Sequence, residues 1–298
     1  MSHPSPITVS ADIHTFMQSN AKSAMRTNIG MIAATTKKVL HVAAHGNNTT
    51  ANGTPELPYL TAQAAYDAAV ALAAPAVLFF GVGSFGNITT SLSGWDDNVT
   101  LGGMGYAVST VGTITCRGGI NVIRGDGNVY ITQINSSGVT GTTGSPGSPG
   151  SPGSDGGTGG DASELQLSGI VAGSVVANGG TGGAGGAGGS SEEGYGNGGG
   201  NGGQGGNGAT ITMSFCKVGI VQSQYGSGGL GGPGGAGPDG DGPPGTDGSV
   251  GTGGGCYIYH SMINELTANA CDYSISSIAT VAATGNPIIA SNTPYFLP

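Results

Sequence analysis

Residues 179–189 read GGTGGAGGAGG, and residues 196–208 continue in the same style as GNGGGNGGQGGNG. No hydrophobic core can be built from such stretches, and glycine loses more conformational freedom on ordering than any other residue. The 298-residue chain contains 63 glycines and only 8% charged residues, yet 37% of it is hydrophobic. Disordered chains combine low hydrophobicity with high charge, so this composition predicts an ordered, repetitive structure.

The glycine-rich stretches belong to an internal repeat of 46 residues. GDASELQLSGIVAGSVVANGGTGG (160–183) aligns without a gap on GNGATITMSFCKVGIVQSQYGSGG (206–229), which places Leu165 on Ile211. A looser copy begins at Cys256. The unit is a pair of short β-type runs followed by a glycine-rich excursion. Stacking of such units predicts that the excursions leave the stack together.

Within the excursions glycine recurs at every third residue, for example from Gly138 to Gly159. Three residues per turn is the period of the polyproline II helix. A flexible linker is the alternative, but the strict period and the equivalent placement favour ordered arms. With two glycines in each turn, two sides of an arm carry no side chain, so the N–H and Cα–H groups on those sides can approach the carbonyl groups of neighbouring arms. We therefore expect GG-rich arms inside a bundle and GSPGSPGSPGSDG (144–156) at its rim, so that valine disrupts the fold at Gly183 or Gly203 and is tolerated at Ser148.

Two interruptions lie near the middle of their excursions, SSEEGYG at Ser190–Gly196 and PDGDGPPG at Pro238–Gly245. They are predicted to be reversals between antiparallel arms, and therefore to gather at one end of the bundle. Recognition residues usually lie in loops. The candidates for contact with a basic or sugar-bearing partner are Glu192, Glu193, Tyr195, Asp239 and Asp241. The alternative is that these residues are simply polar turns.

The N-terminal part is predicted to be a β-domain with a helix at one end. A helix is expected from Thr61 to Ala74, ended by Pro75, and a strand at Val77–Phe80. NVTLGG, GTITCRG, INVIRG and GNVYITQI then follow as strand-length runs. The layout of residues 52–90 resembles the start of right-handed parallel β-helices such as phage tailspikes and pectate-lyase-like proteins. In those proteins a Thr/Ala-rich helix covers the open end of the coil before the first strand.

Two further resemblances are to bacteriophage proteins. A helix capped by Ser10 is predicted over residues 10–28, and the run AKSAMRTNIGM (21–31) is similar to the short helix that opens many phage tail-fibre and appendage proteins. The GGxGGxGG motifs of residues 138–255 resemble the distal tail-fibre adhesins of T-even-like phages, in which glycine-rich motifs form a packed polyproline II bundle. That resemblance implies receptor binding at the bundle tip. The terminal helix is then expected nearer the other end, at the virion.

An enzyme is not expected. Polysaccharide cleavage needs two carboxylates about 5–10 Å apart. The candidates are Asp96 and Asp97, beside Trp95, with Asp126 farther on. Neighbours on a strand point to opposite faces, so Asp96 and Asp97 do not readily share one site, and GWDDN is predicted to be a turn. His260 and Cys256 lie near Glu265 in the sequence but are predicted to serve strand packing.

No metal or cofactor is expected either. Asp239 and Asp241 form a D-x-D pair that could ligate calcium, but an isolated acidic turn is usually just solvated. No GK[ST] follows the glycines, so they are not phosphate loops.

The net charge of −9 is unevenly distributed, since one basic and eleven acidic residues follow Arg124. Nucleic-acid binding there is not expected. The four cysteines have no CxxC spacing and are predicted to be buried free thiols in strands: Cys116, Cys216, Cys256 and Cys271. The apolar run 68–83 is too short to span a bilayer, and no secretory leader is evident. We expect a soluble protein made in the host cytoplasm.

The predicted fold class is mainly β and irregular: an N-terminal helix, a right-handed parallel β-helix-like solenoid, and glycine-rich polyproline II arms packed as a bundle. The predicted function is a non-enzymatic virion adhesin of the tail-fibre or spike type. It is expected to contact a host receptor and to join other virion proteins through its N-terminal segment. The sequence is compatible with both a monomer and a homotrimer. The alternatives are a head-fibre or decoration protein without a receptor, a capsule-degrading tailspike, and an ice-binding protein. The expected domains are an attachment segment (1–50), a β-helix-like domain with its capping helix (51–137), strand repeats with arms (138–255), and C-terminal strands with a tail (256–298).

Overall fold

The computed structural model describes residues 37–268, 272–275, 283–284 and 288–291. The chain divides into two compact units, Met1–Lys38 and Val39–Pro298, and the architecture below is that of the second unit. The helix expected over residues 10–28, and its expected place at the virion end, lie outside the described residues. In the part that is described, the chain is mostly β-structure with one α-helix, which confirms the mainly β prediction.

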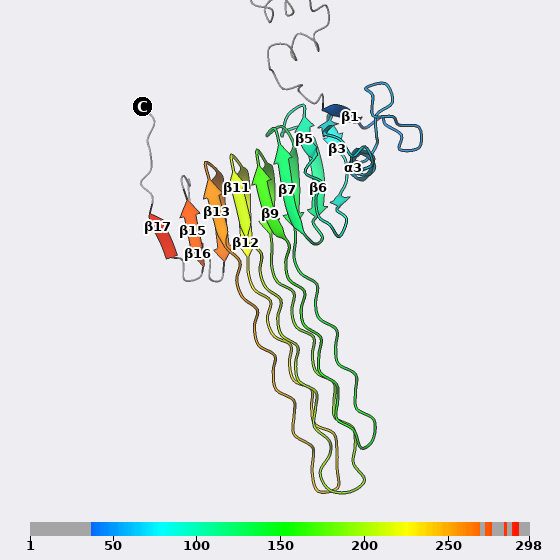
Figure 1. The fold of residues 1–298 in the computed structure, drawn as a ribbon, viewed down its shortest axis with the longest axis vertical. Coiled ribbons are helices and arrows are strands. Elements are labelled where there is room, and N and C mark those ends of the chain that lie inside the picture. Colours follow the sequence, from blue (N-terminus) through cyan, green and yellow to red (C-terminus); the bar gives the residue numbers. More distant parts are fainter. Residues whose placement is uncertain (1–36, 269–271, 276–282, 285–287, 292–298) are drawn as a thin grey trace, which may run out of the picture. The chain divides into compact units, whose positions relative to one another are not determined.

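Two sheets of parallel strands form the β-structure (Figure 1). From β5 onwards consecutive strands alternate between them, so that each sheet is built from every second strand. In spatial order, the first sheet contains β1 (Lys38–Val42), β2 (Ala76–Phe80), β5 (Val99–Gly103), β7 (Ile120–Gly125), β9 (Glu164–Ser168), β11 (Ile211–Ser214), β13 (Cys256–Tyr259), β15 (Asp272–Ile275) and β17 (Ile288–Ser291). The second contains β16 (Ala283–Thr284), β14 (Met262–Ala268), β12 (Lys217–Ser223), β10 (Val171–Val176), β8 (Tyr130–Asn135), β6 (Ser109–Thr115) and β3 (Gly83–Ser84), with β4 (Ile88–Thr89) also paired to β6.

The strand register is the register of the sequence repeat. Leu165 of β9 pairs with Ile211 of β11, as the 46-residue alignment predicted, and Val175 of β10 pairs with Val221 of β12. All four side chains are buried in one hydrophobic cluster shared by the two sheets. A register slip of one residue would turn every buried side chain of a strand outward, so the apolar alternation holds the register.

The predicted helix is present as α3 (Ala62–Ala71), but it ends three residues before the expected Ala74, because Ala73 adopts a left-handed conformation with φ +48°. The Thr61 hydroxyl accepts a hydrogen bond from the Ala64 N–H, which caps the N-terminus. The helix buries Ala62, Ala65, Tyr66 and Ala69 in the core cluster and contacts β2, β4 and β5. The strand after Pro75 is β2, as expected. One difference is that β1 precedes the helix and lies beside β2, because the alternating sequence KVLHV buries Leu40 and Val42.

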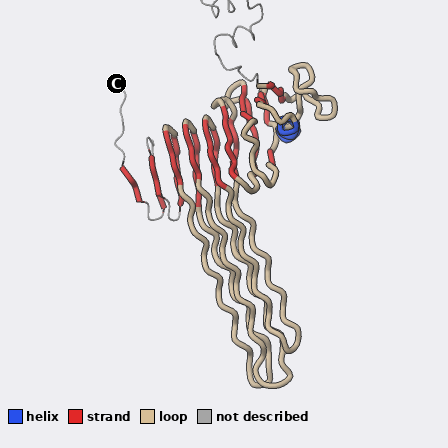
Figure 2. Tube along the Cα trace, viewed as in Figure 1, coloured by secondary structure: helices blue, strands red, loops and turns tan. Residues whose placement is uncertain are grey.

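The glycine-rich excursions are three hairpins that leave the ends of β8, β10 and β12 and return to β9, β11 and β13 (Figures 1 and 2). They extend together on one side of the strands, as the tan segments of Figure 2. Their arms are named 1a (138–149), 1b (151–162), 2a (178–190), 2b (196–208), 3a (224–237) and 3b (241–255).

Backbone hydrogen bonds join the arms at every third residue. In arm 2a, Gly183 donates its N–H to the Gly157 carbonyl of arm 1b, and the preceding Gly182 donates to Ser227 of arm 3a, both at 2.8 Å. The same pair of bonds recurs three residues on and three residues back. The two glycines of each GGx triplet thus bond to different neighbouring arms. The third residue presents its side chain outward, as at exposed Thr181.

Glycine is required inside this bundle because another backbone occupies the place of a side chain. A Cβ atom built on Gly183 would lie 1.9 Å from the Thr142 carbonyl oxygen, and one on Gly203 would lie 2.0 Å from that of Gly157. Along residues 144–156 no residue is fully buried, whereas most glycines of arm 2a are. The expected placement, with GG-rich arms inside and the one-glycine arm at the rim, is confirmed.

The first excursion also reverses, at Ser148–Ser151, which the sequence reasoning did not locate. The Ser151 N–H donates to the Ser148 carbonyl at 2.9 Å, and Gly150 has φ +83°. Pro149 and Gly150 thus occupy the positions that a type II turn prefers for proline and glycine. The collagen-like GSPGSPGSPG stretch therefore folds back on itself within one chain, instead of joining three parallel chains.

Candidate receptor-contact tip

The three reversals lie together at the far end of the arms, and hydrogen bonds join them (Figures 1 and 2). The Gly150 N–H donates to the Ser190 carbonyl at 2.8 Å, which joins the first reversal to the second. The Asp239 N–H donates to Gly194 at 3.2 Å, which joins the second to the third. The predicted gathering of the reversals at one end is confirmed, and we call this region the tip (residues 148–151, 190–196 and 238–241).

The structure brings all five candidate contact residues into the tip. Glu192, Glu193, Asp239 and Asp241 are exposed, and the Tyr195 side chain is 70% exposed. Gly240 lies against the Tyr195 ring, because a Cβ atom on Gly240 would be 3.3 Å from it. The Ser191 hydroxyl donates a hydrogen bond to the Glu193 carbonyl, which closes the second loop.

The tip has strong negative charge, with four carboxylates within two short loops. Lys217, in β12, is the one basic residue between Arg124 and the end of the chain, so no Lys or Arg belongs to the tip. Among the described residues, no three His, Cys, Asp or Glu side chains come together as metal ligands.

The third reversal is narrower than predicted. Residues up to Gly245 were assigned to it, but the Gly242 N–H already donates to Gly235 of arm 3a, and Gly245 donates to Gly232, both at 2.8 Å. Pro243 fits within arm 3b because its carbonyl accepts from Gly199, while the N–H that proline lacks is not needed there. The reversal is confined to Pro238–Asp241.

Side-chain ladders across arms 1b, 2b and 3b were not anticipated. The Asp155 carboxylate accepts from the Asn201 N–H at 2.7 Å, and the Asn201 side chain accepts from the Thr246 N–H at 3.0 Å. A second ladder joins Asp161, Asn207 and Thr252 in the same way. The sequence contains a sign of these ladders, because successive members are separated by 46 and then 45 residues, which is the repeat length that places them side by side in neighbouring arms.

The carboxylates considered for hydrolysis do not form one site. GWDDN is irregular and turn structure, as predicted. Asp96 precedes the start of β5, whereas Asp126 follows the end of β7 and caps the next turn by accepting from the Asn128 N–H. Because β5 and β7 are parallel neighbours, the two carboxylates lie at opposite ends of the strands. Asp97 is exposed.

His260 does not pack within a strand, which corrects the expectation for this residue. It lies in the turn between β13 and β14 with φ +47°, a left-handed conformation that a strand cannot contain. Its ring stacks on Phe215 (centroids 5.3 Å apart), which occupies the equivalent turn one repeat earlier with φ +54°. Cys256 is buried in β13, as predicted.

The cysteines behave as buried thiols where they are described. Cys116 and Cys216 are free and buried, as predicted, but they lie just outside the strands, after the end of β6 and before the start of β12. Cys256 is buried in β13, and Cys271 lies outside the described residues. Burial raises the pKa of the Cys116 thiol to about 12 and also raises the pKa of Cys216. The Cys116 and Cys216 thiols therefore stay neutral at neutral pH, and both residues belong to the hydrophobic core cluster.

No protein-family model, curated protein or solved structure matches this chain. In the described part of the chain no helix is long and apolar enough to cross a membrane.

Proposed function

We propose that this protein is a non-enzymatic structural protein of a bacteriophage virion, a tail-fibre or spike-type adhesin that contacts the host surface through the tip. The observation that carries the proposal is the arm bundle. Three hairpins, bonded backbone to backbone along their length, present exposed acidic and aromatic side chains at their joined reversals. A rigid support under short loops is the usual setting for recognition residues.

The proposal includes a more specific fold. The alternation of consecutive strands between two parallel sheets supports a β-solenoid, and connections between parallel strands are right-handed in nearly all proteins. Hydrogen bonds at every third residue of each arm support polyproline II conformation. A bundle held together by glycine backbones fits the resemblance to T-even-like distal adhesins.

The proposed partner is a host receptor with a basic or sugar-bearing surface. Four carboxylates without a nearby Lys or Arg attract positive charge, and Tyr195 offers an exposed ring to the apolar face of a sugar or to a cation. The N-terminal segment is proposed to attach the protein to other virion proteins. The protein is thus placed, in this proposal, on a tail fibre or another surface appendage.

An architectural decoration role is the first alternative, and it uses the same bundle without a receptor. A capsule-degrading tailspike is the second. The separation of Asp96 from Asp126 argues against that pair as its catalytic carboxylates, because both must flank one glycosidic bond.

The test is binding of the labelled full-length protein to a panel of bacterial cells. The variant Glu192→Ala/Glu193→Ala/Tyr195→Ala is expected to fold normally and to bind less. A matched control, Glu56→Ala/Glu265→Ala/Tyr106→Ala, removes the same number of charges and one exposed tyrosine away from the tip. Unchanged binding by the tip variant, with its folding confirmed, would refute the tip as the contact surface, and absence of binding by the unmodified protein across the panel would favour the decoration role. Cleavage of host envelope polysaccharide would favour the tailspike.

A further inference from the structure

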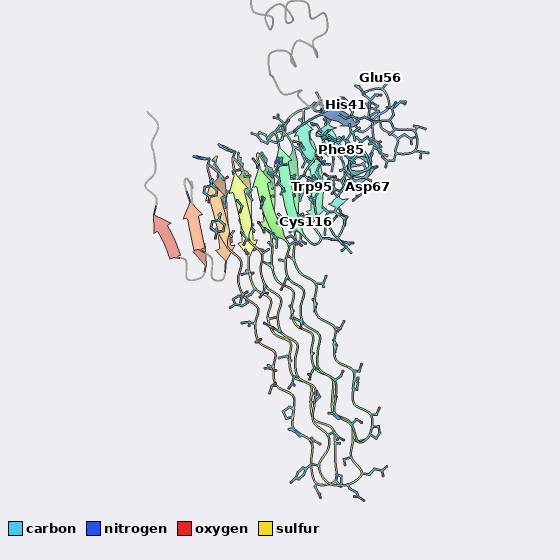
Figure 3. The ribbon with its side chains drawn as sticks, viewed as in Figure 1. His41, Glu56, Asp67, Phe85, Trp95 and Cys116 are labelled. Atoms are coloured by element: carbon cyan, nitrogen blue, oxygen red, sulfur yellow. The ribbon has the colours of Figure 1, made fainter. Side chains whose placement is uncertain are left out.

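A cavity of about 430 Å³ lies beside α3, within the strand-bearing part of the protein and apart from the tip. Tyr66 and Asp67 from the helix line it on one side, and the segment between β4 and β5 lines the other with Ser93, Trp95 and Asp96. Figure 3 shows Asp67 and Trp95 near one another on this side of the strands. Its volume is that of a small-molecule site.

The floor of the cavity is aromatic and fixed. The rings of Tyr66 and Trp95 contact one another with centroids 4.7 Å apart, and the two residues are only 3% and 4% exposed. The Trp95 indole N–H donates to the Val99 carbonyl at 3.1 Å, and its backbone N–H donates to the buried Asn121 side chain at 2.9 Å. Because these two side chains are already held in place, ligand binding would cost little conformational entropy at the floor, which favours affinity.

The polar groups around this floor have unused hydrogen-bonding capacity. The Tyr66 hydroxyl accepts from the Asp96 N–H at 3.4 Å, but no described residue accepts the hydroxyl hydrogen. One carboxylate oxygen of Asp67 accepts from the Gln63 amide, and one of Asp96 accepts from the Asn98 N–H. Among the described residues, the second oxygen of each carboxylate has no hydrogen-bond donor and neither carboxylate has an ion-pair partner.

These groups define the chemistry of a ligand. The buried Tyr66 hydroxyl has a hydrogen to donate, the second oxygens of exposed Asp67 and half-buried Asp96 can accept from a ligand in place of solvent, and the exposed Ser93 hydroxyl can donate or accept. A molecule with several hydroxyl groups can make all of these bonds. An anion is repelled by two uncompensated carboxylates, whereas a protonated amine gains charge-assisted bonds with them.

We propose that this cavity binds a single sugar residue, and that it prefers a hexosamine with a free amine over a neutral hexose and a neutral hexose over a hexuronic acid. The site is independent of the tip: it lies on different elements and uses none of the tip residues. It adds a second glycan-binding position to the proposed function, and it stands or falls separately from adhesion through the tip.

The test compares glucosamine, glucose and glucuronate as probes of the full-length protein at neutral pH, by saturation-transfer NMR and titration calorimetry. The three share a hexose ring and differ in charge. Glucosamine is expected to bind about fivefold or more tightly than glucose, because a charged hydrogen bond is about 1 kcal/mol stronger than a neutral one. Glucuronate is expected to bind weakest. Equal affinity for the three, or binding of none, would overturn the proposal.

Variants locate the site. Asp67→Asn and Asp96→Asn keep the acceptor used by Gln63 or Asn98 and are expected to reduce the glucosamine preference about fivefold each. Tyr66→Phe is expected to weaken the binding of both glucose and glucosamine. Asp97→Asn, which makes the same charge change at an exposed neighbour, should leave affinity unchanged. An equal effect of Asp97→Asn and Asp96→Asn would refute a local site. The Glu192→Ala/Glu193→Ala/Tyr195→Ala variant should bind the sugars normally.

Discussion

Replacing Gly203 with alanine adds one methyl group in the middle of arm 2b, where no space exists for it. The added Cβ would lie 2.0 Å from the Gly157 carbonyl oxygen of arm 1b, whereas ordinary contact begins at 3.4 Å. The two arms must therefore separate by roughly 1.4 Å. Two backbone hydrogen bonds cross between these two arms beside this position: the Gly156 N–H donates to the Asn201 carbonyl and the Gly159 N–H donates to the Gln204 carbonyl, both at 2.8 Å. The separation of the arms breaks or stretches both bonds.

The magnitude follows from these two bonds. A buried backbone group left without its partner costs about 1–3 kcal/mol, so two such losses cost about 2–6 kcal/mol. That is a large fraction of the roughly 5–15 kcal/mol by which a domain is stable. We expect Gly203→Ala to open the bundle locally while the strands remain folded, because each repeat depends mainly on its neighbours.

The assay is amide hydrogen exchange read by mass spectrometry, with peptic peptides from the arms and from β9–β12 followed separately. Trypsin is unsuitable for the arms, which contain no Lys or Arg. The matched control is Gly198→Ala in the same arm, where the added Cβ meets its nearest atoms, those of Pro243, at 3.7 Å. Gly203→Ala should speed exchange in the arms, and Gly198→Ala should leave it unchanged or slower. Equal protection from hydrogen exchange in the two variants would show that close packing does not require glycine at residue 203. It would favour the alternative that the arms are flexible linkers.

Three further outcomes are expected. Ala73 follows the end of α3 with φ +48°, so the variant Ala73→Gly should be about 1 kcal/mol more stable than the unmodified protein, whereas Ala68→Gly, inside the helix, should be less stable by at least a similar amount, as measured by Tm. Asn201→Ala removes the acceptor of the Thr246 N–H and hydroxyl and should cost about 1–2 kcal/mol in urea unfolding, while Gln204→Ala, at an exposed position of the same arm, should be neutral. Because burial raises the pKa of Cys116 from its ordinary value of 9.0 to about 12, the neutral thiol stabilises the fold fully below pH 9, and this contribution is lost as the pH rises toward 12. The urea midpoint of Cys116→Ala should therefore fall less steeply with pH over that window than the midpoint of the unmodified protein, and parallel curves would contradict the assignment.

Several features could be predicted from the sequence because they depend on residues near one another or on a fixed period. The start of helix α3 near Thr61 and the strand after Pro75 were predicted from the local sequence, because proline cannot continue a helix. The pairing of Leu165 with Ile211 follows from a 46-residue repeat whose apolar alternation allows one register. The inner position of arm 2a follows from two glycines per turn, since only a residue without Cβ lets a second backbone approach so closely.

Other features depend on packing that has no period and are determined only by the tertiary structure. Asp67 on α3 and Asp96 after β4 share a cavity because of how the helix lies against the following segment, and nothing in their spacing of 29 residues indicates it. The left-handed turn at His260 contradicts the strand expected there, since the chain must change sheets at that residue. The third reversal ends at Asp241 because Gly242 already finds its partner in arm 3a. A repeat predicts which residues recur, but the contacts where the repeat begins, turns or ends are made between segments whose relative positions only the folded chain determines.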